Sequence, residues 1–147
     1  MTLTLAFTLK VPGRDEFRDF QAVSTSFLCE GRLTLEGEEL TIEWGGEARV
    51  QEVGLLTLAD DRVTMPDEWL TVSVGELDRA TLEGGWWRPR LALFERRRGA
   101  LAAVPSASLG AVRCWIARRD RDHARTFAAA LTDVIATLTP TLERGPP

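Results

Sequence analysis

The residue types that commonly perform catalysis are sparse in this sequence. His123 is the only histidine, and it lies beside Asp120 and Asp122 near the expected start of a helix, where a surface role explains it. None of the serines lies in a Gly-x-Ser-x-Gly turn, and neither a G-x-G-x-x-G nor a P-loop pattern is present. The carboxylate pairs at 38–39 and 60–61 fall in predicted turns, where solvation explains them. We therefore expect a protein that is not an enzyme and uses no cofactor.

Sulfur and imidazole ligands are also few. A structural zinc site needs more Cys and His ligands than Cys29, Cys114 and His123 provide, and no spacing of carboxylates indicates another kind of metal site. Both cysteines have apolar or small neighbours, which favours buried thiols in a reducing compartment. We expect no metal site.

Two adjacent tryptophans with arginines beside them are the most unusual local feature. Trp86 and Trp87 are followed by Arg88 and Arg90. Successive residues of a strand point to opposite faces, so we expect one tryptophan in the core and the other outside. An exposed tryptophan beside arginines is typical of a protein interface, and it also suits a membrane surface. The alternative is a hairpin whose outer tryptophan packs under an arginine stem.

A second basic feature is the segment Glu95–Gly99, which contains Arg96, Arg97 and Arg98. Such a loop can bind phosphate or carboxylate groups, or it can simply be solvated. More arginines follow near the expected helix start, at positions 118, 119, 121 and 125. Cations are unfavourable at that end of a helix, so neighbouring aspartates or an outside anion would have to compensate them.

The charge of the chain is divided unevenly between its halves. Residues 1–78 contain 6 basic and 16 acidic side chains, and residues 79–147 contain 12 basic and 6 acidic ones, for a net charge of −4. A negative total argues against nucleic acid as a partner. We expect the two halves to attract each other within one fold or between copies, and we predict a homodimer.

The length and composition indicate one domain. The chain has 147 residues, of which 44% are hydrophobic and 27% charged, and we assign residues 1–140 to a single domain and residues 141–147 to a frayed tail. No run approaches the roughly 20 apolar residues that span a bilayer. The first residues lack the basic region of a signal peptide. We expect a cytoplasmic protein.

Alternation of apolar and polar residues predicts strands over most of the chain. Residues 3–11 form the first, which Pro12–Gly13 is expected to end, and residues 14–30 leave helix and strand open. Turns are expected at 37–38, 45–46, 59–62 and 84–85. The further predicted strands cover residues 32–36, 39–44, 47–53, 55–58, 69–74, 77–83, 86–94, 101–104 and 111–117. Pro89 predicts an edge strand or a bulge.

One segment near the C-terminus has helical periodicity. Its apolar residues are Ala124, Phe127, Ala128, Leu131, Val134, Ile135 and Leu138. They form one continuous stripe, which predicts a helix over 121–139 that ends before Pro140 and docks on the preceding sheet. Phe127 and Leu131 should be its deepest residues.

The order of these elements resembles the pleckstrin-homology-like superfold in its bacterial and GRAM-like versions. The likeness rests on residues 31–42, 70–82 and 114–138. It implies an α+β fold, mainly antiparallel β, in which a partly open orthogonal β-barrel is capped by one C-terminal amphipathic helix. Domains of this kind bind proteins, peptides or phosphoinositides. The lipid-binding versions carry Lys and Arg in the first hairpin, where this chain has Glu36, Glu38, Glu39 and Glu43.

These observations favour a non-catalytic interaction module that binds protein partners or itself. The alternative is a peripheral binder of anionic lipid, or of another anionic ligand, through the Trp and Arg surface.

Overall fold

The computed structural model of the chain describes the backbone of residues 2–18, 21–53 and 58–143, and the side chains of residues 2–10, 28–45 and 66–138. In this part of the chain seven strands form one antiparallel sheet in the order β4-β3-β2-β1-β7-β6-β5, and the sheet ends at β4 and β5 without closing. The strands are β1 (Thr2–Arg18), β2 (Gln21–Glu36), β3 (Glu39–Val53), β4 (Leu58–Ser73), β5 (Leu77–Glu83), β6 (Arg90–Glu95) and β7 (Ala111–Trp115). The predicted α+β class, mainly antiparallel with one C-terminal helix, is confirmed.

The helical elements follow or interrupt the strands. Two short 3-10 turns are η1 (Val74–Glu76) and η2 (Arg118–Asp120), and the helix α1 spans Arg121–Glu143. The imidazole of His123, in the first turn of α1, hydrogen bonds through Nε2 to the Thr4 carbonyl oxygen of β1. The one histidine therefore ties the start of the helix to the first strand.

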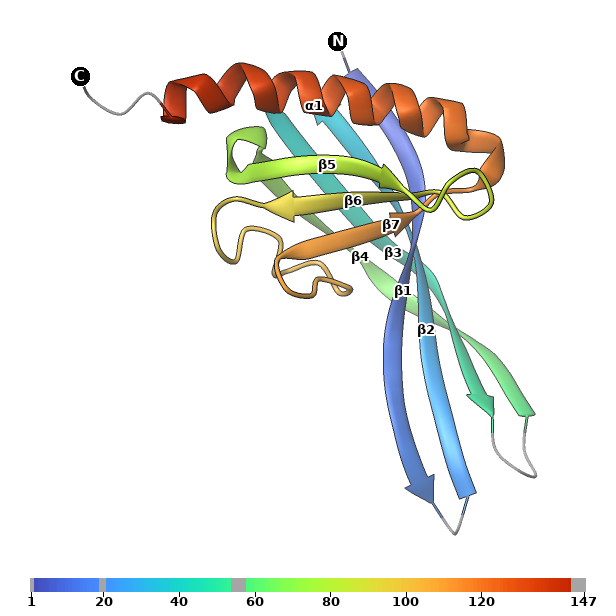
Figure 1. Cartoon of the computed structure of the whole chain (residues 1–147). Coiled ribbons are helices and arrows are strands. Elements are labelled where there is room, and N and C mark those ends of the chain that lie inside the picture. Colours follow the sequence, from blue (N-terminus) through green and yellow to red (C-terminus); the bar gives the residue numbers. More distant parts are fainter. Residues whose placement is uncertain (1, 19–20, 54–57, 144–147) are drawn as a thin grey trace.

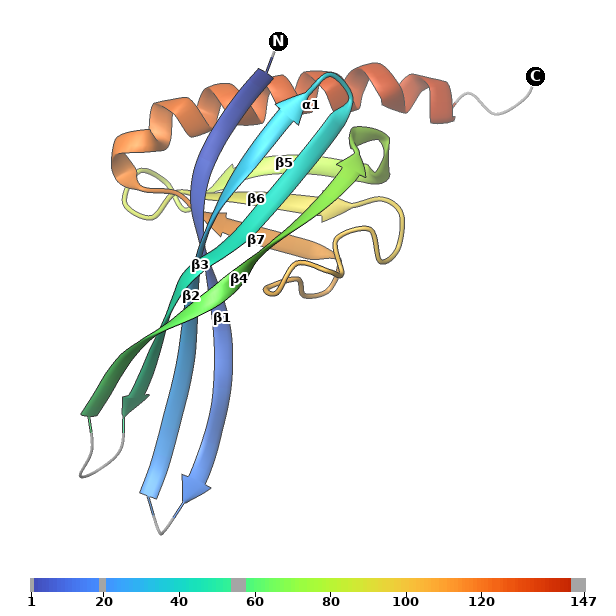
Figure 2. The same ribbon diagram turned by 180° about the vertical axis from the view of Figure 1, so that it is seen from behind.

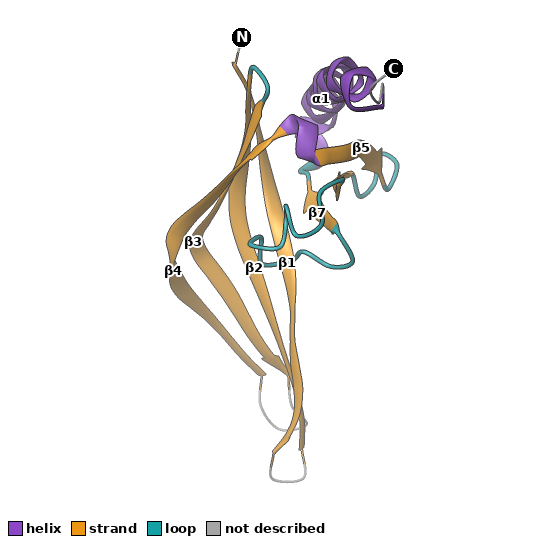
Figure 3. Cartoon of the chain, turned by 90° about the vertical axis from the view of Figure 1, so that its left-hand side faces the viewer, coloured by secondary structure: helices purple, strands orange, loops and turns teal. Residues whose placement is uncertain are grey.

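The sheet consists of a long meander, β1–β4, and a shorter one, β5–β7. The register between them has a single aligned pair, Thr8 with Trp115, where β1 meets β7. The short strands run in a different direction from the long ones, whose hairpins extend well beyond the rest of the molecule (Figures 1 and 2). Figure 3 shows α1, β5 and β7 on one side of β1–β4, and no described element covers the opposite face. We call this opposite face the outer face.

The core lies between β1–β4, β5–β7 and α1. On β1 the buried side chains alternate, as Leu5, Phe7 and Leu9, while Thr4, Ala6 and Thr8 point to the outer face. Phe127 and Leu131 are fully buried on α1, as predicted, and the helix packs on β5, η1 and β1. The largest buried side chains thus come from both meanders and from the helix, which makes the core continuous across them.

Gly31 on β2 allows the Phe7 ring and the β3 backbone to approach closely in this core. A Cβ at this position would lie 2.4 Å from Cζ of Phe7 and 2.3 Å from the carbonyl oxygen of Glu43. The flanking register partners of Gly31 are Phe7 and Trp44, both buried. A residue with a side chain would therefore displace either the Phe7 ring or the β3 backbone.

Two predicted turns prove to be irregularities inside long strands. Strand β1 continues past Pro12–Gly13 to Arg18, with a register shift between Pro12 and Asp15. Strand β3 likewise runs through Gly45–Gly46, with a shift between Trp44 and Gly46, opposite a shift in β2 between Leu28 and Glu30. Glycine is common at bulges as well as at turns, and here the neighbouring strand keeps both segments paired. The open stretch 14–30 belongs to β1 and β2 where it is described.

Other predicted boundaries also need correction. Residues 59–62 lie inside β4 instead of forming a turn, and residues 55–57 of the adjoining predicted strand lie outside the described residues. Residues 101–104 form turns instead of a strand, although Leu101 and Val104 are buried. The helix passes Pro140 and continues to Glu143, so residues 141–143 belong to it and not to a tail.

Truncation of the helix core should measure how strongly α1 holds the fold together. Leu131 is completely buried, so Leu131→Ala should lower the free energy of unfolding by about 2–5 kcal/mol. Thermal and urea unfolding followed by circular dichroism will measure this change, with the exposed Ala129→Ser in the same helix as the control. An unfolding curve equal to that of the control would contradict the packing of α1.

Candidate binding surface

The outer face of β1–β4 is built from rows of register partners. One row consists of Thr4, Thr34, Thr41 and Thr71, in which the hydroxyls of Thr41 and Thr71 lie 3.1 Å apart. Hydroxyls of this kind are compatible with water, and a threonine row favours strand structure. This part of the outer face is accordingly a solvated surface.

The next row contains an ion pair and a bare aromatic ring. Its members are Ala6, Arg32, Glu43 and Trp69. Arg32 Nη2 lies 3.0 Å from Glu43 Oε2, and Trp69 leaves 71% of its surface exposed. Contact with a partner would remove the apolar surface of this ring from water, which is favourable.

A cavity of about 610 Å³ opens beside this row. Its described lining includes Trp69, the carboxylates Glu30, Glu43, Asp67 and Glu68, and the basic residue Arg32. We call these four carboxylates, together with Trp69, the acidic end. A positively charged group is the natural complement of such a lining.

The join between β1 and β7 carries the reverse charge. Trp115 of β7 lies between two cations: Lys10 Nζ is 4.0 Å from the ring centroid, and Arg90 Cζ is 5.1 Å from it. Cations stack over aromatic faces because the ring quadrupole attracts them. Arg90 also lies 4.0 Å from Glu83, its register partner on β5.

The loop between β5 and β6 carries the tryptophan pair. Trp86 and Trp87 are 54% and 59% exposed, and their ring centroids lie 4.4 Å apart with the planes tilted by 33°. The prediction of one buried and one exposed tryptophan is wrong, because β6 begins only at Arg90 and the two residues lie in the preceding turn. Arg118 of η2 stacks 4.7 Å from the Trp87 ring.

The loop is fixed at its base. Ile116 N–H donates to the Pro89 carbonyl at 2.9 Å, and Arg88 N–H donates to the Gly84 carbonyl at 3.4 Å. Gly84 and Gly85 both have positive φ, as the predicted turn requires. The tryptophans are therefore presented on a defined backbone. We call Lys10, Arg88, Arg90, Arg118 and Arg119, together with Trp86, Trp87 and Trp115, the basic end.

A second cavity joins the two ends. It measures about 210 Å³ and is lined by Trp115 and Arg119 on one side and by β1 and β2 on the other. Ala6, Glu30 and Gly31 line both this cavity and the larger one. The two cavities therefore adjoin, and the described lining of the smaller one includes Arg119 together with Glu30 and Asp120.

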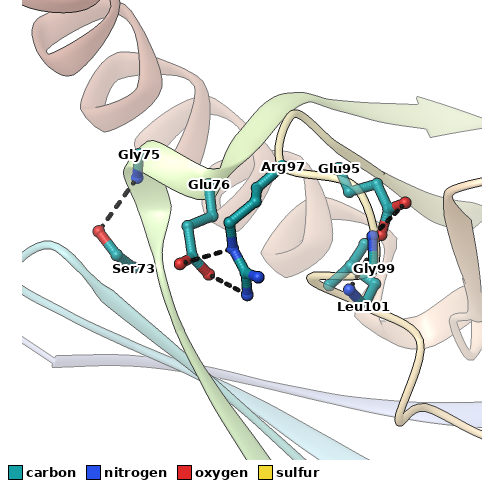
Figure 4. Close-up of polar contacts among 7 residues, drawn as sticks. All are labelled: Ser73, Gly75, Glu76, Glu95, Arg97, Gly99 and Leu101. Atoms are coloured by element: carbon teal, nitrogen blue, oxygen red, sulfur yellow. Dashed lines mark hydrogen bonds and ion pairs between the residues drawn. The ribbon is translucent and has the colours of Figure 1, made fainter.

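Two of the three arginines in the predicted anion-binding loop form ion pairs within the chain. Arg97 Nε lies 3.0 Å from Glu76 Oε1, and Arg96 Nη2 lies 3.8 Å from Asp78 Oδ1 (Figure 4 shows the Arg97 pair). The backbone amides of both arginines also donate to the Glu76 carbonyl, at 2.7 and 3.2 Å. These contacts fasten the loop to η1 and β5, while Arg98 is exposed.

Glu95 also stabilises this loop, by accepting hydrogen bonds from its backbone. Its Oε1 accepts from Gly99 N–H and its Oε2 from Leu101 N–H, each at 3.0 Å (Figure 4). These two backbone hydrogen bonds, from Leu101 first and Gly99 second, hold the pKa of the Glu95 carboxyl below its usual range, with help from Arg97 and Arg98. The acidic residue thus shapes a turn that places Leu101 in the core.

The remaining reactive groups are buried thiols. Cys29 and Cys114 are both buried, as predicted, and neither is in a disulfide. Burial raises the pKa of both thiols, and for Cys114 it reaches about 12, so this thiol stays protonated. Among the side chains the structure describes, no group of His, Cys, Asp and Glu is placed to hold a metal ion.

No family model, no curated protein and no solved structure matches this chain. Within the described ranges, none of the helices combines the length and the apolar character needed to cross a membrane.

Sequence reasoning found part of this surface. It selected Trp86, Trp87, Arg88 and Arg90, which the structure places near one another at the basic end. It overlooked Trp69, although the expectation that Leu70, Val72 and Val74 share the buried face already implies that Trp69 points outward. Trp115 and Lys10 gave no local signal, since their contact depends on the pairing of β1 with β7.

The lowered pKa of Glu95 gives a test of the loop by pH. The carboxylate form accepts the two amide hydrogen bonds, so the stability that it contributes is present above the unfolded pKa and is lost as the pH falls through the lower folded pKa. The NMR shifts of the Gly99 and Leu101 amides should therefore titrate together, with a midpoint below about pH 4.3, the ordinary Glu value.

The control for this titration is the Gly75 amide, which donates to the Ser73 hydroxyl at 3.3 Å and should not follow the midpoint (Figure 4). In Glu95→Gln the joint titration should disappear. A shared midpoint at or above the ordinary Glu value would show that the hydrogen bonds do not stabilise the charged carboxylate.

Proposed function

We propose that the chain is a non-catalytic interaction module that binds a protein partner through the basic end, with Trp86 and Trp87 as its anchors. The observation that carries the proposal is the exposure of these two stacked rings, each more than half open to solvent, on a loop fixed by backbone hydrogen bonds. Tryptophan and arginine are the residue types that most often dominate protein interfaces.

Preorganisation supports this assignment. Binding costs less when anchor side chains already hold their bound positions. Here the two rings contact each other, and the guanidinium of Arg118 lies over Trp87 at 4.7 Å. The loop therefore offers a firm apolar surface next to cations, which fits a partner with an apolar pocket and an acidic rim.

The proposed fold type is the pleckstrin-homology-like one, as a partly open orthogonal barrel. The supporting features are the four-strand and three-strand meanders, their different directions in Figure 1, and a C-terminal helix packed on the core between them. In folds of this type the function lies in surface sites and not in the architecture. The buried thiols, neither of them in a disulfide, favour a cytoplasmic setting.

An anionic membrane or ligand is the second candidate. The specific observation in its favour is the clustering of Arg88, Arg118 and Arg119 beside exposed tryptophans, a combination that also suits lipid headgroups. The acidic first hairpin, with Glu38 and Glu39 exposed, does not favour phosphoinositides at that end.

Replacement of the anchors tests the proposal. Trp86→Ala/Trp87→Ala should lose protein partners that the wild type retains in quantitative pull-downs from the source cells, because truncation of anchor residues typically costs about 2 kcal/mol or more of binding. The melting curve should stay close to that of the wild type, since both rings are mostly exposed.

The matched control is Leu109→Asn. Leu109 is fully exposed with φ of 53°, a conformation that asparagine tolerates, so this variant also removes exposed apolar surface. Partners lost equally from both variants would count against the basic end. Sedimentation with vesicles of phosphatidylserine and phosphatidylcholine decides the second candidate: salt-sensitive binding that needs Trp86 and Trp87 would replace the protein partner with a membrane.

A further inference from the structure

We infer that the partner of the basic end is the acidic end of a second copy of this chain, and that the contact is reciprocal. In such a pair, each acidic end lies against the basic end of the other copy. The inference rests on the proposed function, because it names the occupant of the same Trp and Arg surface.

Charge complementarity is the first argument. Among the described residues of the acidic end, the carboxylates of Glu30, Glu43, Asp67 and Glu68 outnumber the cation of Arg32, which is already paired with Glu43. At the basic end the cations are Lys10, Arg88, Arg90, Arg118 and Arg119, and the nearby carboxylates are Glu83 and Asp120. The two surfaces have opposite excess charge, so they attract each other and each repels its own kind.

Exposed aromatic rings at both ends are the second argument. Trp69 stands at the acidic end, and Trp87 stands at the basic end. A cation from the facing copy can stack on Trp69 in the same way that Lys10 and Arg90 stack on Trp115. The rings supply the apolar contact area, while the charges determine which ends meet.

The position of the two ends makes the contact self-limiting. They adjoin each other, since Ala6, Glu30 and Gly31 line both cavities. A two-fold axis through this shared middle places the acidic end of each copy on the basic end of the other. A reciprocal contact of this kind is complete at two copies, which predicts a closed dimer and not a filament.

The dimer should respond to salt. Its charged groups are largely exposed, and the Debye length falls from about 10 Å at 0.1 M to about 3 Å at 1 M salt. Light scattering of the purified full chain should therefore report twice the monomer mass at low salt, without larger species as the concentration rises. The dissociation constant should increase at high salt.

Complementary charge reversal provides the decisive test. Asp67→Arg/Glu68→Arg makes both ends basic, and Arg118→Glu/Arg119→Glu makes both ends acidic, so each variant alone should be a monomer. Mixed in equal amounts, the two variants should form a heterodimer, because each contact again joins opposite charges. Native mass spectrometry distinguishes this 1:1 pair from either homodimer.

Control variants carry the same changes of charge elsewhere. Glu38→Arg/Glu39→Arg alters the exposed end of the β2–β3 hairpin, and Arg98→Glu/Arg125→Glu alters two exposed arginines outside both ends. These controls should dimerise like the wild type. Circular dichroism melts of all variants verify that they are folded.

Several outcomes would overturn the inference. A wild type that remains monomeric at low salt and high concentration, a mixture that fails to pair, or controls that lose the dimer would each contradict it. A series of masses beyond the dimer would contradict the two-fold arrangement. None of these results affects the pull-down comparison of Trp86→Ala/Trp87→Ala with Leu109→Asn, so failure of the dimer and failure of the proposed function are distinguished.

Discussion

The whole arrangement depends on how the inner face of the long meander is covered. Alternation along β1 puts Leu5, Phe7 and Leu9 on one side, and the strands beside it continue that apolar face. Such a face must be removed from water. Strands β1 and β7 are aligned at a single pair, Thr8 with Trp115. The short meander can therefore change direction at this pair and, together with α1, cover the inner face of the long meander. The outer face then has no covering element among the described residues.

Much of this architecture follows from local patterns. The alternation of Leu5, Phe7 and Leu9 on β1 and the helical stripe through Phe127 and Leu131 each require a buried side, and the structure provides it. Glycine pairs were less informative. Gly84–Gly85 forms a turn, whereas the similar pair Gly45–Gly46 lies inside β3. The difference arises from partners: β2 and β4 pair with β3 on both sides, and this pairing is encoded far away in the chain.

Local sequence also does not reveal which partners the arginines contact. The run Arg96-Arg97-Arg98 indicates anion binding when it is considered alone, but Glu76 and Asp78 already face two of its members. The backbone amides donate to the Glu76 carbonyl, and no spacing in the sequence reports this contact. Trp86 and Trp87 could be recognised because their composition alone is unusual, whereas Trp69 needed the assignment of faces on β4.

The acidic end and the basic end belong to different parts of the sheet. The acidic end lies mainly on β2–β4, and the basic end lies on β6, β7, η2 and the adjoining loop. Trp115 takes part in both the joining of the two meanders and the basic end. It pairs with Thr8 where the meanders join, and its ring contacts the cations of Lys10 and Arg90. The pairing that lets the sheet cover its core therefore also determines the separation between the carboxylates and the cations. Two copies of the chain have the same separation, and for this reason the proposed contact between them can be reciprocal.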